Sequence, residues 1–268
     1  MRIVRTIAEV RAALEPHRAA GDRIALVPTM GALHAGHLAL LEAARADADL
    51  VVMSLFVNPR QFRDPHDLAR YPRDEERDAQ LAAEAGVDLV FAPGAEELYP
   101  DGFQTAVEVE ELSRPLEGEF RPAHFRGVAT ICLKLFNIVR PHVAFFGQKD
   151  AQQVAVVRRM VRDLDLELEV QAVPTVRDPD GLALSSRNAR LSPEERRRAL
   201  AIPRALEVGR AAHQRGEDAA AAARAALDGL EADYVEIADF DRRPTLAIAA
   251  TVGSARLIDN LPLEGDPE

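Results

Sequence analysis

His34 and His37 stand three residues apart in the stretch Pro-Thr-Met-Gly-Ala-Leu-His-Ala-Gly-His, residues 28–37. An apolar run, residues 24–27, precedes this stretch, and a helix-like run, residues 38–44, follows it. This order predicts a buried strand, a glycine-containing turn and a helix whose first turn carries both imidazoles on one face. The free N–H groups and the dipole of a helix start attract anions, phosphate above all. The stretch therefore indicates a site for a phosphate-bearing ligand.

Two other interpretations of the histidine pair compete with this one. A zinc site needs further ligands, and neither the single cysteine, Cys132, nor an H-E-x-x-H pattern supplies them. Histidines that only cap or pack are the common case for a bare H-x-x-H. The preceding strand and turn favour phosphate binding, because they place the imidazoles at the positive end of a helix dipole.

A second predicted strand-to-helix junction carries a lysine. The run Phe-Phe-Gly-Gln-Lys-Asp, residues 145–150, ends a strand-like segment and leads into a helix-like one. Lys149 offers a compact ammonium at the strand end, a form of charge that often binds phosphate. Asp150 fits a helix cap, a ribose contact or a place near Mg²⁺, and the sequence leaves these three open.

Two polar stretches complete the candidate chemistry. Residues 185–188, Ser-Ser-Arg-Asn, combine hydroxyls with a guanidinium, which can surround a polyphosphate and stabilise a pyrophosphate leaving group. Taken alone this stretch is weak, since serine-rich turns are common. Asn58 and Gln61 follow another strand-like run, and their neutral amides suit a hydroxylated acid better than a bare phosphate.

The elements that must position these residues follow an alternating pattern. Near-continuous apolar runs alternate with helix-like segments up to about residue 175, which is typical of a parallel sheet covered on both faces. Ligands of such sheets bind beyond the carboxyl ends of the strands. Because Pro28, Asn58 and Gly147 each follow directly on an apolar run, we expect the candidate residues at one edge of the sheet.

The pattern changes after residue 175. A turn signal at residues 177–181 is followed by Ser192-Pro-Glu-Glu, a strong helix start, then by helical stretches and short strand candidates. We predict an α/β chain with a Rossmann-like catalytic domain at residues 1–175. A smaller α+β domain at residues 176–268 is expected to act as a lid.

Composition narrows the function classes. A net charge of −11 argues against a broad nucleic-acid or anionic-membrane surface, so an anionic ligand needs a local basic pocket. No apolar run approaches the roughly 20 residues of a membrane span, and the N-terminus lacks a signal-peptide core. The single cysteine excludes an internal disulfide, and its apolar neighbours predict a small buried hydrophobe. A cytoplasmic protein is the default expectation.

Together the segments resemble the pantoate–β-alanine ligase (pantothenate synthetase) family of the HIGH-type nucleotidyltransferase superfamily. The shared motifs appear in the family's order over the whole expected catalytic part. They are P-T-M-G-x-L-H-x-G-H at 28–37, F-V-N-P-x-Q-F at 56–62, Y-P-R at 71–73, H-F-R-G-V at 124–128, F-F-G-x-K-D-x-Q-Q at 145–153, V-P-T-V-R at 173–177 and S-S-R-N at 185–188.

The resemblance implies an enzyme that couples ATP, (R)-pantoate and β-alanine in two steps. The pantoate carboxylate attacks the α-phosphorus of ATP, giving a pantoyl adenylate and pyrophosphate. The β-alanine amine then attacks the adenylate carbonyl, releasing pantothenate and AMP. Mg²⁺ is expected to neutralise the departing pyrophosphate, and the resemblance also implies a homodimer.

Roles of single residues follow from the same motifs. His37 is expected as the proton donor, and His34, Lys149 and Arg187 as groups that stabilise the crowded negative charge. Gln61 and Gln153 are expected to hold pantoate, with Gln61 also near β-alanine, and Asn58 joins this group. The ATP site is expected to comprise Met30, Gly31, Ala32, Leu33, His34, Ala35, Gly36, His37, Gly147, Gln148, Lys149, Asp150, Val176, Leu184, Ser185, Ser186 and Arg187.

The chain departs from the family pattern at three positions. Gln148 stands where Glu is common, and Leu184 where Met is common. Arg77 interrupts the acidic stretch after residue 73, and of its carboxylates only Asp78 is carried over, as a neighbour of Mg²⁺ or β-alanine.

Two rival functions remain open at this level. A simple nucleotidyltransferase would stop after adenylyl transfer, but the group Asn58, Gln61 and Gln153 points to a pocket for a second small polar substrate. A nucleotide-binding regulatory module would make His37 and Lys149 dispensable for turnover.

Overall fold

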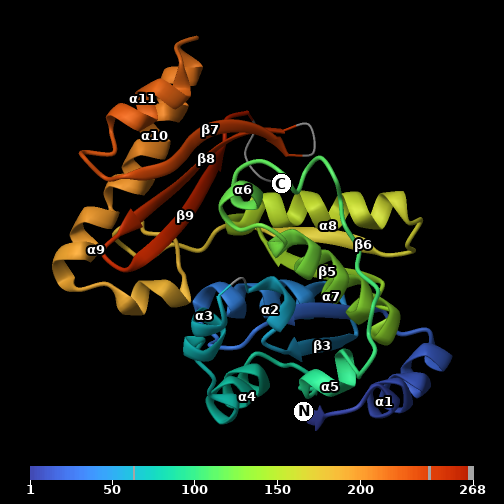
Figure 1. Cartoon of the computed structure of the whole chain (residues 1–268). Helices are drawn as coiled ribbons and strands as arrows, with labels where there is room; N and C mark the ends of the chain where they lie inside the picture. Colours follow the sequence, from blue (N-terminus) through green and yellow to red (C-terminus); the bar gives the residue numbers. More distant parts are fainter. Residues whose placement is uncertain (63, 241–242, 265–268) are drawn as a thin grey trace. The chain divides into compact units, whose positions relative to one another are not determined.

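The computed structural model describes residues 1–62, 64–240 and 243–264 as two compact units (Figure 1). The first unit comprises Met1–Gly147 and Gln152–Val173, and the second comprises Gln148–Ala151 and the chain from Pro174 onward. The short segment Gln148–Ala151 thus interrupts the first unit along the chain and is grouped with the second. The division at residues 175 and 176, with a lid role for the second part, stays a prediction.

A six-stranded sheet organises the first unit, and all its described pairings are parallel. The strand order β1-β4-β3-β2-β5-β6 changes direction between β2 and β5, the place where such sheets bind ligands. The α/β Rossmann-like prediction is confirmed. The strands are β1 (Arg2–Val4), β2 (Ile24–Thr29), β3 (Leu50–Leu55), β4 (Leu89–Phe91), β5 (Val143–Gly147) and β6 (Glu169–Val173).

Helices cover both faces of this sheet. The helices are α1 (Ile7–Ala20), α2 (Ala35–Asp47), α3 (Pro65–Arg70), α4 (Glu75–Glu84), α5 (Ala95–Leu98), α6 (Glu117–Phe120), α7 (His124–Val139) and α8 (Ala151–Asp163), with short 3₁₀ turns η1 (Pro59–Gln61) and η2 (Gln148–Asp150). β1 and α1 are absent from the predicted elements, because β1 has three residues and Pro16 interrupts the helical pattern of α1.

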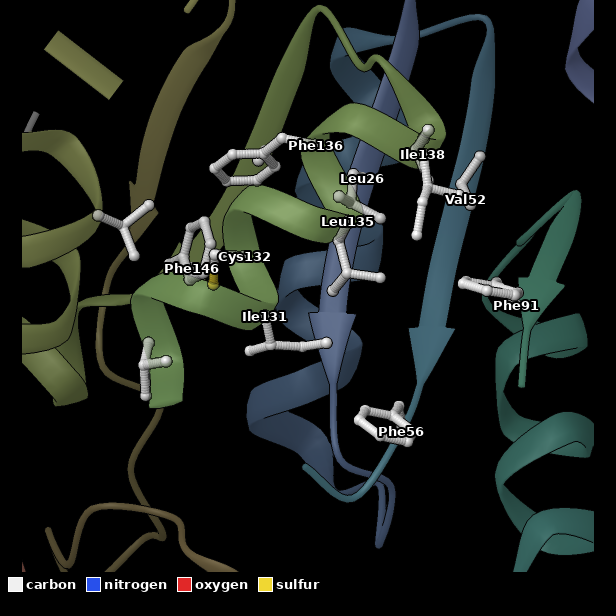
Figure 2. Close-up of a cluster of buried hydrophobic side chains, with 14 of the residues drawn as sticks. Leu26, Val52, Phe56, Phe91, Ile131, Cys132, Leu135, Phe136, Ile138 and Phe146 are labelled. Carbon is white, nitrogen blue, oxygen red and sulfur yellow. The ribbon is translucent and has the colours of Figure 1, made fainter. Parts of the chain in front are cut away.

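Alternation along the strands builds two cores. Leu26 of β2 lies in the cluster that includes residues of α1, α7 and α8, whereas Val27 lies in the cluster with residues of α2. Figure 2 shows Ile131, Cys132 and Leu135 of α7 in the first cluster, beside Leu26. Burial raises the pKa of the Cys132 thiol to about 12, so the prediction of a small buried hydrophobe is confirmed.

The second unit is an antiparallel sheet with its own helices. Its elements are η3 (Ser186–Arg190), α9 (Pro193–Ala199), α10 (Ala201–Gln214), α11 (Ala219–Ala225), β7 (Ala232–Phe240), β8 (Arg243–Val252) and β9 (Ala255–Pro262). Ser192 caps α9 in a capping box with Glu195, as predicted. Ile202 and Leu206 of α10 pack in one core with Leu246 and Ile248 of β8. No helix of the described residues is long and apolar enough to cross a membrane.

Candidate active site

The two histidines form a capping box with their imidazoles. The Gly36 N–H donates to His34 Nδ1 at 3.1 Å, and the His34 N–H donates to His37 Nδ1 at 3.3 Å. A ring nitrogen that accepts a hydrogen bond carries no proton, so each neutral imidazole holds its proton on Nε2. The ring centroids lie 4.2 Å apart. The two imidazoles thus sit side by side at the start of α2.

The turn before these histidines is held by a carboxylate. Gly31 and Ala32 both adopt left-handed backbone conformations, with φ of 84° and 54°. The N–H groups of Ala32 and Leu33 donate to the two carboxylate oxygens of Asp78, each at 2.8 Å. A Cβ on Gly31 would lie 2.7 Å from Asp78 Oδ2 and 2.9 Å from Leu55 Cδ1, so only glycine fits here.

These contacts correct one expectation about the helix start. The main-chain N–H groups of Ala32, Leu33, His34 and Gly36 donate to side chains of the protein and are not available to an anion. The helix dipole remains, and the two imidazoles lie at the same helix start.

Asp78 is buried, and its carboxylate is hydrogen-bonded to the main chain. Its side chain lies on α4, the residue is 2 % exposed, and both oxygens accept main-chain N–H groups. Mg²⁺ prefers several oxygen ligands and retains water. Among the described residues no group of three or more His, Cys, Asp or Glu side chains could hold a metal ion. Asp78 thus fixes the turn before His34, and its assignment as a neighbour of Mg²⁺ or β-alanine stays a prediction.

Asn58 supports Gln61 at the end of β3. The Asn58 Nδ2 group donates to Gln61 Oε1 and to the Gly127 carbonyl, both at 3.1 Å. Its Oδ1 accepts from Tyr99 Oη at 2.9 Å, and burial raises the Tyr99 pKa to about 12, which keeps this hydroxyl protonated. Asn58 is 1 % exposed, so it fixes the orientation of the Gln61 amide from inside the protein.

Gln61 links this region to the turn that carries the histidines. Its Nε2 group lies 2.8 Å from Met30 Sδ, and its main-chain carbonyl contacts His124 Nδ1 at 3.0 Å. Tyr99 and His124 are supports that the sequence interpretation missed. His124 opens the motif at residues 124–128, whereas Tyr99 lay outside every motif.

The consecutive glutamines of α8 differ in their contacts. Gln152 is 5 % exposed, accepts from the Glu117 N–H at 3.1 Å and donates to the carbonyls of Leu112 and Pro115. Its amide is therefore committed to the loop before α6. Gln153, the predicted pantoate ligand, is half-buried.

The second unit brings three predicted ATP residues to one small pocket. Lys149, Ser185 and Arg187 all line it, although 36 or more positions separate Lys149 from the other two. The Lys149 side chain is 15 % exposed, and its Nζ lies 3.8 Å from Asp150 Oδ1. Apolar and polar residues complete the lining: Leu182, Ala183, Asn188, Ile202, Leu257, Ile258 and Asp259.

A short hairpin positions the serine stretch. The Leu184 N–H donates to the Val176 carbonyl at 3.0 Å, and Arg177 and Ala183 form a β-bridge. Arg177 also forms two hydrogen bonds, of 2.6 and 3.0 Å, with the buried carboxylate of Asp259 on β9. Asp259 belonged to no sequence motif, and the signal that could have revealed it is a carboxylate between the apolar residues Leu257 and Ile258 and the amide of Asn260.

Comparison with known proteins decides the family. The family model described as pantoate-beta-alanine ligase matches residues 2–262. The chain belongs to the pantoate-beta-alanine ligase family. The expected family membership is thereby confirmed.

Relatives of this ligase family match over their whole length. The pantothenate synthetase of Moorella thermoacetica is 52 % identical, with 98 % of this chain and 99 % of the relative covered. Pantothenate synthetase 1 of Bradyrhizobium diazoefficiens is also 52 % identical, with both chains fully covered.

Solved structures of the ligase family agree with the fold. The pantothenate synthetase of Thermus thermophilus superposes with a TM-score of 0.93 at 49 % identity, covering 99 % of this chain and 100 % of the other. The pantoate-beta-alanine ligase of Francisella tularensis, solved with beta-gamma ATP and beta-alanine, gives a TM-score of 0.84 at 33 % identity, with both chains fully covered.

Proposed function

We propose that this chain is an ATP-dependent pantoate–β-alanine ligase that forms pantothenate, AMP and pyrophosphate. The observation that carries the proposal is the family match over residues 2–262. The Francisella relative, solved with beta-gamma ATP and beta-alanine, supports the same substrates.

The first step places a carboxylate against a triphosphate. A carboxylate oxygen of pantoate attacks the α-phosphorus, and the bond from that phosphorus to the bridging oxygen of pyrophosphate breaks. Negative charge grows on the departing pyrophosphate, so donors aimed at it stabilise the transition state more than the ground state. The Nε2–H groups of His34 and His37 are such donors, and His37 is the proposed proton donor.

We propose that cationic and hydroxyl groups of the second unit bind the phosphates of ATP. The Lys149 ammonium, the Arg187 guanidinium and the hydroxyls of Ser185 and Ser186 would hold the phosphates. The remaining predicted ATP residues, from Met30 to Gly36 and at Gly147, Gln148, Asp150, Val176 and Leu184, would hold the nucleotide through packing contacts and through main-chain groups that the protein does not already engage.

Gln61 and Gln153 would hold pantoate, with Asn58 as the support of Gln61. In the second step the β-alanine amine attacks the adenylate carbonyl carbon, the bond from that carbon to the AMP oxygen breaks, and the new amide nitrogen loses a proton. Water would hydrolyse the adenylate, so we propose that residues 176–268 act as a lid during the reaction.

Mg²⁺ is proposed as a companion of the ATP substrate. Bound to phosphate oxygens, it would neutralise part of the pyrophosphate charge. The carboxylate of Asp78 already accepts two main-chain N–H groups, so no step is assigned to a metal at Asp78.

A homodimer is proposed from the family resemblance, and a cytoplasmic location from the use of ATP as a substrate. Light scattering on the purified chain measures the first, and fractionation of the source cells the second.

One experiment separates the ligase from its rivals. The protein is incubated with ATP, Mg²⁺ and pantoate, with and without β-alanine, and pyrophosphate and AMP are followed. A ligase releases AMP in an amount that depends on β-alanine. A simple nucleotidyltransferase releases pyrophosphate regardless of β-alanine, and a regulatory module releases neither product. AMP release that ignores β-alanine would sink the ligase proposal.

A further inference from the structure

Asn260 contacts the main chain of the lysine turn through two hydrogen bonds. It lies on β9 and is 5 % exposed. Its Nδ2 group donates to the carbonyl of Gln148 at 3.0 Å and to the carbonyl of Lys149 at 2.8 Å. Two carbonyl partners also fix the orientation of the amide, since only its nitrogen can donate to both.

Packing alone does not explain a carboxamide at this position. The Asn260 Oδ1 atom is buried and has no hydrogen-bond partner among the described residues. A buried acceptor without a partner destabilises the fold, and an apolar side chain of similar size would avoid that cost. The contribution of Asn260 therefore lies in its two donated bonds.

Those bonds act on the segment that presents the Lys149 ammonium. Gln148 and Lys149 belong to η2, a single 3₁₀ turn between β5 and α8. Fixing the carbonyls on both sides of the Lys149 Cα restricts the direction of its side chain, which lines the pocket with Ser185 and Arg187. A flexible lysine held in this way needs less ordering when a phosphate binds.

The neighbouring residue anchors Asn260 itself. The Asn260 N–H donates to Asp259 Oδ1 at 2.8 Å, and Asp259 is paired with Arg177. Arg177 in turn donates to the Gly181 carbonyl at 3.1 Å, within the hairpin that leads to Ser185. Consecutive residues of β9 thus hold both segments that carry the cations of the pocket.

We propose that Asn260 is a positioning residue for adenylate formation, acting through Lys149. This inference rests on the proposed function. It assigns a role in the first step to a residue of β9 that lies outside the motifs quoted above.

A double-mutant cycle tests whether Asn260 acts through Lys149. The variants are Asn260→Ala, Lys149→Ala and the double variant, and the readout is pantoate-dependent pyrophosphate release at saturating ATP without β-alanine. We expect Asn260→Ala to lower the rate about tenfold in the native background and less than about twofold when Lys149 is already alanine, because coupled residues are not additive. The same factor in both backgrounds would show that Asn260 acts independently and would overturn the proposal, as would an unchanged rate in Asn260→Ala.

A control and a second readout keep the outcome decisive. Thr245→Val removes one side-chain hydrogen bond, to the Arg243 carbonyl at 3.0 Å, from a buried residue of the same sheet. It should lower the melting temperature without changing the rate. If the native chain releases no pyrophosphate with pantoate, the proposed function fails, and the same cycle is then measured on ATP dissociation constants by calorimetry. If Asn260→Ala weakens ATP binding by the same factor with and without Lys149, the role of Asn260 is overturned. A smaller factor in the Lys149→Ala background supports it.

Discussion

Two strand-to-helix junctions of this chain each have main-chain polar groups that a distant side chain binds. In one junction that side chain accepts hydrogen bonds, and in the other it donates them. At the β2–α2 junction, the Asp78 carboxylate accepts two main-chain N–H groups from 45 and 46 residues away. At the β5–α8 junction, the Asn260 amide donates to two main-chain carbonyls from 111 and 112 residues away. In both, a buried side chain from a distant segment occupies the polar groups of the turn.

The difference determines what each junction offers to an anion. At the first junction the N–H groups of the turn are occupied, and two imidazoles whose Nδ1 atoms accept main-chain N–H groups lie at the helix start. Occupied carbonyls at the second junction remove acceptors that would repel phosphate, and the group presented is the full charge of Lys149. We therefore expect the first junction to depend on geometry and the second on charge.

The largest effect is expected from the reacting groups themselves. Lys149→Ala or His37→Ala should lower turnover by about 10²–10³, because each removes a donor preorganised for transition-state charge. Lys149→Arg should recover part of the loss if charge dominates at the second junction. Steady-state kinetics measure all three variants.

His17→Ala is the control for these kinetics, because His17 pairs with Asp22 on the surface. Its turnover should equal that of the native chain. Near-normal turnover in His37→Ala or Lys149→Ala would remove that residue from the mechanism.

The glycines of the two junctions should respond differently to an added methyl group. Gly31→Ala should lower the free energy of unfolding by about 3 kcal/mol, since it combines a left-handed φ with overpacking against Asp78. Gly147→Ala should change it by less than about 1 kcal/mol, because no described atom lies within 4 Å of the added Cβ. Urea denaturation measures both, and equal losses would contradict the contrast between the junctions.

Asp78→Asn should lower the free energy of unfolding by about 2 kcal/mol, because one buried N–H loses its acceptor. Turnover should fall with it, while the Mg²⁺ concentration for half-maximal rate stays unchanged. Asp88→Asn is the matched control, since Asp88 accepts the Val51 N–H at 2.8 Å but its side chain is 40 % exposed. A large rise in the Mg²⁺ concentration that Asp78→Asn needs for half-maximal rate would show that this carboxylate takes part in metal binding.

The smallest effect is expected at the start of α4, the helix that carries Asp78. A hydrogen bond from Arg5 lowers the pKa of Glu75 below its usual value of 4.5. Its stabilisation is therefore present above pH 4.5 and is lost as the pH falls through the lower folded-state pKa. The pair is exposed, so Glu75→Gln should cost below about 1 kcal/mol.

Melting temperatures of the native chain and Glu75→Gln, taken from pH 7 to pH 3, measure this loss. The difference between the two proteins should shrink as the pH falls. A difference that grows toward low pH would contradict the sign of the pKa shift.

Residue patterns were enough to predict the family, the parallel sheet and the candidate segments. These depend on local signals: apolar runs mark β2, β3 and β5, and the Ser192 capping box marks the start of α9. The short β1 escaped prediction, because three residues carry too little periodicity for detection.

Which polar groups of each junction are occupied becomes visible in the folded chain. The sequence predicted free N–H groups at the start of the helix, whereas Asp78 accepts the N–H groups of Ala32 and Leu33 in the turn before it. The role of Asn260 was not predicted, because no residue pattern near Asn260 indicates that it contacts the main chain of Lys149. Hydrogen bonds between segments 45 to 112 residues apart depend on how the fold brings those segments together. A local residue pattern carries no information about such contacts.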